Sequence, residues 1–299
     1  MKKIKKLSFA LSILSILTFF TPANAELKVV TSIKPIHSLA SYLMDGIGKP
    51  ELIVDGYASP HGFSMKPSHA KMLQNADLIF WVGEDLEGFL EKPLKSIAKK
   101  AEKIELIEIK GLNVLKFRER NIFDEHDHDD HDDHGKKEDD HDDHDHDDHG
   151  KKEDDHDDHD HDDHGKKEEH DDHDDHDGHE GHAHGEFDPH IWLDTMNAKA
   201  MLNEMAEHLI ENDPKNEAKY KSNLDKALKD IDKLTIEVMT ELNNSVSSIV
   251  FHDAYQYFEK RFNINVLGAF TVNTDVMPGA EQLAEIREII EHDKVACVF

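Results

Sequence analysis

The chain lacks a surplus of basic residues: its 35 Lys and Arg face 65 Asp and Glu, which gives a formal net charge of -30 at pH 7. This balance leaves no basic surface for nucleic acid or anionic lipid, so we expect neither as a partner. The acidity is local, because the stretch from Asp124 to Glu186 holds 32 acidic residues and 6 Lys and so accounts for -26 of the total. The rest of the chain is close to neutral and long enough for two medium-sized hydrophobic cores.

Long apolar segments and cysteines are equally scarce. The apolar run Leu7–Phe20 is too short to span a membrane. It follows the lysine-rich start Met1–Lys6 and precedes Ala23-Asn24-Ala25, which is typical of a secretory signal peptide cleaved after Ala25. We therefore expect a soluble mature protein in an oxidising compartment. Cys297 is the only cysteine, and one odd thiol in a secreted chain requires a partner.

The stretch from Asp124 to Glu186 is built almost entirely from His, Asp, Glu, Gly and Lys, and Gly-Lys-Lys-Glu recurs in it at Gly135, Gly150 and Gly165. It has one aliphatic side chain and nothing to bury, so a disordered insertion is predicted.

Imidazole and carboxylate are ligands that zinc and similar divalent metals prefer, and His-rich tracts are typical of metal binding. A purely solvating acidic segment is the alternative, but it needs no His, and 18 of the 25 His lie here. The predicted weak ligands are His126, His128, His131, His134, His141, His144, His146, His149, His156, His159, His161, His164, His170, His173, His176, His179, His182 and His184.

Outside this stretch, β-rich runs alternate with helical patterns. Strands are expected at residues 27–33, 51–54, 77–82 and 103–109, with helices at 35–44, 67–75 and 86–100 between and after them; after the insertion, helices are expected at 195–211, 254–261 and 278–291, and strands at 247–251, 265–269 and 294–299. Such alternation predicts βαβ units and an α/β fold with mainly parallel sheets.

An apolar stripe from Leu224 to Leu242, with steps of three and four residues, predicts one helix from Pro214 to about Asn243. At about 1.5 Å per residue this helix is longer than one small domain needs, so we expect it to join two lobes, although an ordinary long core helix fits the periodicity equally well. The expected organisation is a signal peptide (1–25), an N-terminal lobe (26–123 and 187–213) interrupted by the insertion (124–186), a linking helix (214–246) and a truncated C-terminal lobe (247–299).

Three histidines outside the insertion are candidate ligands of a single metal ion. His61 lies in a loop after a strand, His190 lies in Asp188-Pro189-His190-Ile191-Trp192-Leu193, and His252 ends a strand. In open α/β sheets ligands bind beyond the carboxyl ends of strands, and three neutral imidazoles make a tetrahedral zinc site with one position left over. The remaining histidines, His37, His69, His208 and His292, fall within predicted helices and are interpreted as surface or capping residues.

A zinc hydrolase also fits three histidines and an open position. The sequence has no His-Glu-x-x-His pair, nucleophile elbow or phosphate-binding glycine loop, and no Glu stands out as a general base near these histidines. We therefore expect no catalysis.

Several motifs occur in a fixed order along the chain: Ser59-Pro60-His61-Gly62-Phe63-Ser64, Lys66-Pro67-Ser68, Gln74-Asn75-Ala76-Asp77-Leu78, the His/Asp-rich insertion, Asp188-Pro189-His190-Ile191-Trp192-Leu193, Phe251-His252-Asp253-Ala254-Tyr255, Thr271-Val272-Asn273 and Pro278-Gly279-Ala280. With these motifs the chain resembles the zinc-binding periplasmic proteins of bacterial zinc ABC importers, the ZnuA type. The resemblance implies two βα lobes joined by a long helix, Zn2+ held between them by His61, His190 and His252, and delivery of that ion to a membrane permease by a monomeric periplasmic protein.

Two features depart from that family. Some members carry a Glu directly before the first ligand, where this chain has Pro60, and members continue for several more elements, so the fourth ligand and the partner of Cys297 have no candidate. The family also includes manganese and iron carriers, which usually place a carboxylate where His252 stands, so a third imidazole favours zinc. A periplasmic metal store, in which the insertion is the functional part, is the alternative from a different class.

Overall fold

A computed structural model describes residues 26–123, 185–242, 247–272, 277–293 and 295–299. These residues belong to one compact unit. The predicted signal peptide and all 18 histidines of the insertion lie outside the described residues. Within the described part of the chain, no helix is both long enough and apolar enough to cross a membrane.

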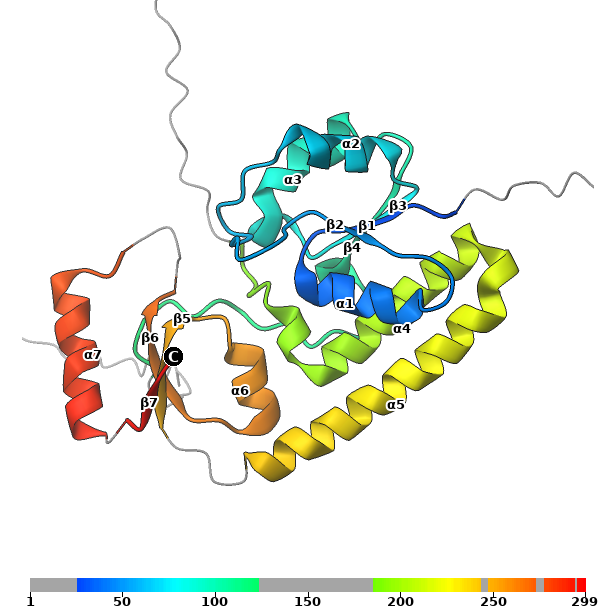
Figure 1. Ribbon diagram of the computed structural model, residues 1–299. Coiled ribbons are helices and arrows are strands. Elements are labelled where there is room, and N and C mark those ends of the chain that lie inside the picture. The colour runs from blue at the N-terminus through cyan, green and yellow to red at the C-terminus, as the bar shows by residue number, and fades with distance from the viewer. Residues whose placement is uncertain (1–25, 124–184, 243–246, 273–276, 294) are drawn as a thin grey trace, which may run out of the picture. The chain divides into compact units, whose positions relative to one another are not determined.

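The first sheet has four parallel strands in the order β2-β1-β3-β4. Helices α2 and α3 lie on one face of this sheet, and α1 and α4 lie on the other (Figure 1). The elements are β1 (Val29–Thr31), α1 (Lys34–Leu43), β2 (Glu51–Leu52), α2 (Pro67–Asn75), β3 (Leu78–Trp81), α3 (Glu84–Ser96), β4 (Glu102–Glu105), the 3-10 turns η1 (Leu106–Glu108) and η2 (Ile191–Leu193), and α4 (Thr195–Asn212).

Helices on both faces explain why β3 is apolar at every position: all four of its residues are buried. The helices contribute apolar side chains at helical spacing, such as Ile36, Ala40 and Leu43 of α1. The main hydrophobic core of the described chain lies around this sheet.

The second sheet has three parallel strands in the order β6-β5-β7. Its elements are β5 (Ser248–His252), α6 (Gln256–Phe262), β6 (Val266–Thr271), α7 (Ala280–His292) and β7 (Cys297–Val298). The core here is small, with Val250, Val266 and Ala269 buried together. The predicted α/β fold with parallel sheets is confirmed in both halves.

The long helix α5 (Glu217–Glu241) is shorter than expected, because Pro214–Asn216 form a separate 3-10 turn, η3, before it. Its first half packs on α4 and α1 and buries Tyr220 and Ala227. Its second half does not continue the buried stripe, since Leu234 is 46% exposed. The sequence pattern therefore overstated how much of this helix is core.

The four strands of the first sheet and β7 are shorter than predicted, and β4 and β7 show how such strands end. Strand β4 ends at Glu105, which pairs with the last residue of β3, Trp81. One further bond joins the Ile107 N–H to the Val82 carbonyl at 2.9 Å, where the backbone has already turned into η1. Strand β7 pairs with Ser248 and Ile249 of β5, and backbone hydrogen bonds of Ala296 and Phe299 continue this contact on either side of it.

The segment before the insertion, at the end of the expected N-terminal lobe (26–123), forms backbone hydrogen bonds with the second sheet. Asn121 accepts a hydrogen bond from the backbone N–H of Ala269 at 2.8 Å, and Phe123 donates one to Leu267 at 2.9 Å. Residues 121–123 thus lie along the outer edge of β6, next to Gly268, whose missing Cβ leaves room for the Asn121 carbonyl.

Candidate metal centre

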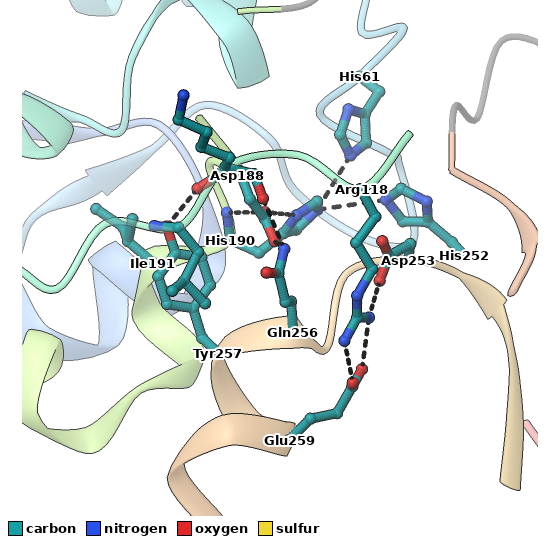
Figure 2. A network of polar contacts seen from close by, with 12 residues as sticks. His61, Arg118, Asp188, His190, Ile191, His252, Asp253, Gln256, Tyr257 and Glu259 are labelled. Carbon is teal, nitrogen blue, oxygen red and sulfur yellow. Dashed lines mark hydrogen bonds and ion pairs between the residues drawn. The ribbon is translucent and has the colours of Figure 1, made fainter. Parts of the chain in front are cut away.

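His61, His190 and His252 come from three separate segments and meet at one point (Figure 2). His61 lies in the loop between β2 and α2, His190 precedes η2, and His252 is the last residue of β5. The Nε2 atom of His190 is 3.3 Å from Nε2 of His61 and 3.3 Å from Nε2 of His252. His190 is buried, and the other two are half-buried.

The spacing of these nitrogens fits one metal ion. Two nitrogens bound to a tetrahedral zinc at about 2.0–2.1 Å lie about 3.3–3.4 Å apart. The rings do not stack face to face, since they are tilted or edge-on to one another with centroids 5.1 to 5.4 Å apart. Such an arrangement directs ring-edge nitrogens, rather than ring faces, at a common point.

Asp188 fixes the orientation of His190. Its Oδ1 lies 2.7 Å from His190 Nδ1 and also accepts the backbone N–H of His190 at 2.9 Å. With the proton held on Nδ1 by this carboxylate, Nε2 keeps the lone pair that a metal needs. Asp188 is itself held by the amide of Gln256, at 3.3 Å from Oδ2, and by the Tyr257 hydroxyl, which donates to its carbonyl at 2.6 Å.

The loop that carries His61 is anchored by aromatic packing just after the histidine. Phe63 stacks on His69 of α2, with ring centroids 5.4 Å apart, and lies against Phe89 of α3 at 5.0 Å. His69 Nδ1 accepts the backbone N–H of Lys66 and so caps α2, as expected from sequence, although its side chain is buried rather than on the surface. These contacts tie the loop to the first sheet's helices.

An ion-pair network supports the third histidine. Arg118 donates to Asp253, the residue after His252, at 2.8 Å, and to Glu259 of α6 at 2.5 Å. Burial raises the pKa of Asp253 to about 6, although Arg118 opposes that shift. Burial, with a smaller contribution from His190, lowers the pKa of His252 to about 4. His252 is therefore neutral at pH 7, the form in which imidazole binds metals.

The structure thus brings together all three histidines singled out from the sequence, and it adds partners that the sequence analysis missed. Asp188, Gln256 and Tyr257 hold His190, while Arg118 and Glu259 lie behind His252. The Asp two residues before His190 was a visible signal, since a carboxylate at this spacing can bond both the ring and the backbone. The others lie 60 or more residues from their partners and left no local pattern.

Fold and site together define a class: an α/β protein with parallel sheets and a candidate three-imidazole metal centre. A sequence profile of the family ZnuA, described as "Zinc-uptake complex component A periplasmic", matches residues 29–299. The chain belongs to this family.

Relatives agree with that assignment, and solved structures share the fold. The high-affinity zinc uptake system protein ZnuA of Brucella abortus is 42% identical over 273 residues, covering 91% of this chain and 75% of the relative. The protein of the same name from Yersinia pestis is 33% identical over 289 residues, covering 95% and 79%. A crystal structure of ZnuA has a TM-score of 0.62 at 18% identity, covering 90% and 79%, and AdcAII of Streptococcus pneumoniae scores 0.61 at 19%, covering 91% and 79%. The chain spans about three quarters of the length of these proteins.

Proposed function

We propose that this protein binds Zn2+ in the periplasm and delivers it to the membrane permease of an ABC importer, without catalysis of its own. The observation that carries this is the convergence of three imidazole nitrogens at the spacing of zinc ligands, with Asp188 behind the central one. Membership of a family described as a periplasmic zinc-uptake component supports the compartment and the transport role. The name of the Brucella relative supports the same cargo.

In this proposal His61, His190 and His252 are the ligands of the transported ion. They lie on segments attached to different sheets, His61 before α2 and His252 on β5, so binding would draw the two predicted lobes together around the metal. An all-nitrogen donor set favours zinc over manganese, which suits carboxylate and carbonyl oxygens. The protein acts as a monomer with its signal peptide removed.

The His/Asp-rich insertion serves as a collector. Its composition offers many imidazoles and carboxylates but almost no apolar side chains that could hold them in a preformed site, so we expect each of its sites to bind zinc more weakly than the three-histidine centre. Glu186, at its end, is four residues from His190, so an ion released there enters the centre at high effective concentration.

The test is zinc affinity, measured by chelator competition on the full chain and on His61→Ala, His190→Ala and His252→Ala. Each change should weaken the single tight site by at least about 100-fold, since loss of one ligand costs more than loss of an outer partner. His292→Ala is the matched control, because it removes an imidazole from the end of α7. Wild-type affinity in all three variants would overturn the ligand assignment, and the absence of any tight site would favour a metal store.

Transport is tested separately by growth under zinc limitation in cells that depend on this protein. The ligand variants should fail to support growth, whereas His292→Ala should support it. Normal growth with a variant that has lost tight binding would show that the centre is not the transport site.

A further inference from the structure

A second group of metal-ligating side chains lies on α4 and β4. His208 and Glu211 are in the last turns of α4, and Glu102 is the first residue of β4. One ring nitrogen of His208 and one oxygen of each carboxylate lie within 4.8 Å of one another. His208 is thirteen residues beyond Thr195, where α4 begins near His190, so the group is about 20 Å along the helix from the three-histidine centre.

The two nitrogens of His208 have different surroundings. Its Nε2 bonds Glu204 Oε1 at 3.4 Å, one turn earlier on α4. A proton held on Nε2 by this carboxylate leaves the lone pair on Nδ1, which is the usual arrangement of a metal-bound histidine. Nδ1 lies 2.8 Å from Glu102 Oε1 and 3.9 Å from Glu211 Oε2.

Nδ1 is nevertheless a buried atom without a hydrogen-bond partner. If a proton on Nδ1 alone explained the short distance to Glu102, the N–H would point at Glu102 Oε1 and form a hydrogen bond with it. The contact to Glu102 Oε1, at 2.8 Å, does not have the geometry of a hydrogen bond. An ion bound to Nδ1 would lie where oxygens of both Glu102 and Glu211 can reach it.

Glu102 is held in place on its other side. Asn212 donates to Glu102 Oε2 at 2.7 Å, and its amide also donates to the His208 carbonyl at 2.9 Å. This bond leaves Oε1 free to face Nδ1, so one oxygen of Glu102 is positioned as a ligand and the other is oriented by an outer partner.

The adjoining groove is acidic. Four carboxylates and two lysines line it: Glu105, Glu108, Glu204, Glu207, Lys103 and Lys110. With Glu102 and Glu211 beside it, negative charge exceeds positive charge, and such a surface concentrates cations.

We propose that Glu102, His208 and Glu211 form a second binding site for a divalent cation of the zinc class, supported by Glu204 and Asn212. One imidazole, two carboxylates and water make up a donor set that zinc accepts. The site is weaker than the three-histidine centre, because the Glu211 side chain is 62% exposed and has to be ordered to bind. It fills only after that centre is saturated.

The experiment follows His208 directly in the full chain, so that zinc bound by the insertion does not obscure the result. Histidine ring carbons are labelled with 13C, and the His208 resonance is identified by its loss in His208→Gln. Zinc is then added beyond the amount that saturates the tight site. We expect the His208 resonance to shift with zinc, and Glu102→Gln and Glu211→Gln to raise the midpoint at least about 10-fold.

Glu207→Gln is the matched control, since Glu207 lies on the same helix and in the same groove but outside the ligand group. Its midpoint should equal that of the wild type. The proposal is overturned if the His208 resonance does not respond to zinc, or if Glu102→Gln and Glu207→Gln have the same midpoint. A proton-bridged ion pair without metal would give the first of these results.

Discussion

The substitution Asp188→Asn tests whether the carboxylate behind His190 prepares that imidazole to bind zinc. Asn keeps the size of the side chain and one acceptor oxygen, but it removes the negative charge. In the wild type this charge holds the proton on Nδ1 of His190 and raises the basicity of Nε2. Asp188 is only 1% exposed, so solvent screens this charge little.

The magnitude follows from the partners of Asp188. Loss of an outer carboxylate costs about 10- to 100-fold in metal affinity, or about 1.4 to 2.8 kcal/mol. We expect the upper half of this range. If the Asn oxygen accepts from His190, its NH2 meets the NH2 of Gln256 donor to donor. The Gln256 amide cannot flip by 180° without losing a hydrogen bond, because the same NH2 group donates to the Lys116 carbonyl at 2.9 Å.

Zinc affinity is measured with a competing chelator strong enough to keep the insertion's sites empty. Asp194→Asn is the control, because Asp194 caps α4 and pairs with Arg261 at 2.6 and 2.7 Å without touching a proposed ligand. It should lower the free energy of unfolding by about 1.5–3 kcal/mol and leave zinc affinity unchanged. Equal affinity of Asp188→Asn and wild type, or equal losses in the two variants, would refute the reasoning.

Three further predictions concern pH and the insertion. Acid should release zinc as the pH falls below about 6.5, the ordinary imidazole pKa, because protons compete with the metal. Burial lowers the pKa of His252 to about 4, so zinc release at about pH 5 should be accompanied by the uptake of fewer than three protons. Calorimetry in several buffers measures this number, and zinc occupancy that does not change with pH at limiting metal would contradict the prediction. Burial raises the pKa of Glu87 from 4.5 to about 7, so its stabilising contribution is present below pH 4.5 and is lost as the pH rises through 7. As the pH rises from 4.5 to above 7, the free energy of unfolding of Glu87→Gln, measured by urea titration, should therefore increase by about 3 kcal/mol relative to that of the wild type. A difference in unfolding free energy that does not change with pH would count against an ionisable buried carboxyl. Deleting residues 124–186 should leave the tight site intact but lower zinc stoichiometry and slow transfer from a weak chelator, an effect that salt reduces; equal rates and stoichiometry at low ionic strength would exclude a collector.

Local sequence was sufficient for the fold class and most elements. Helix α2 begins at Pro67 and ends at Asn75, as predicted, and Asp194 caps α4 where its helical sequence pattern begins. These features depend on neighbours three or four residues away, so they are visible in the chain itself. The three candidate histidines were also identifiable, because each lies beside turn or strand-end residues rather than within an apolar face.

Element ends and partners were decided by tertiary structure. Strand β4 stops where β3 stops. Helix α5 packs on α4 and α1, but its buried residues all lie in its first half, and Leu234, Ile236 and Met239 are exposed in its second. Pairing and packing of this kind depend on segments far apart in sequence, which periodicity does not report.

Dependence on distant segments also explains why the three candidate histidines could be found from the sequence but most of the residues that hold them could not. Their residue types and strand-end positions could be found from the sequence, but the 3.3 Å spacing of their nitrogens requires the loop before α2, the turn before α4 and the end of β5 to meet. Likewise His208 was interpreted as a surface or capping residue, because its neighbour Glu102 is 106 residues away and reaches it only when β4 lies next to α4. Sequence determines which side chains can bind a metal, whereas the folded backbone determines which of them share one ion.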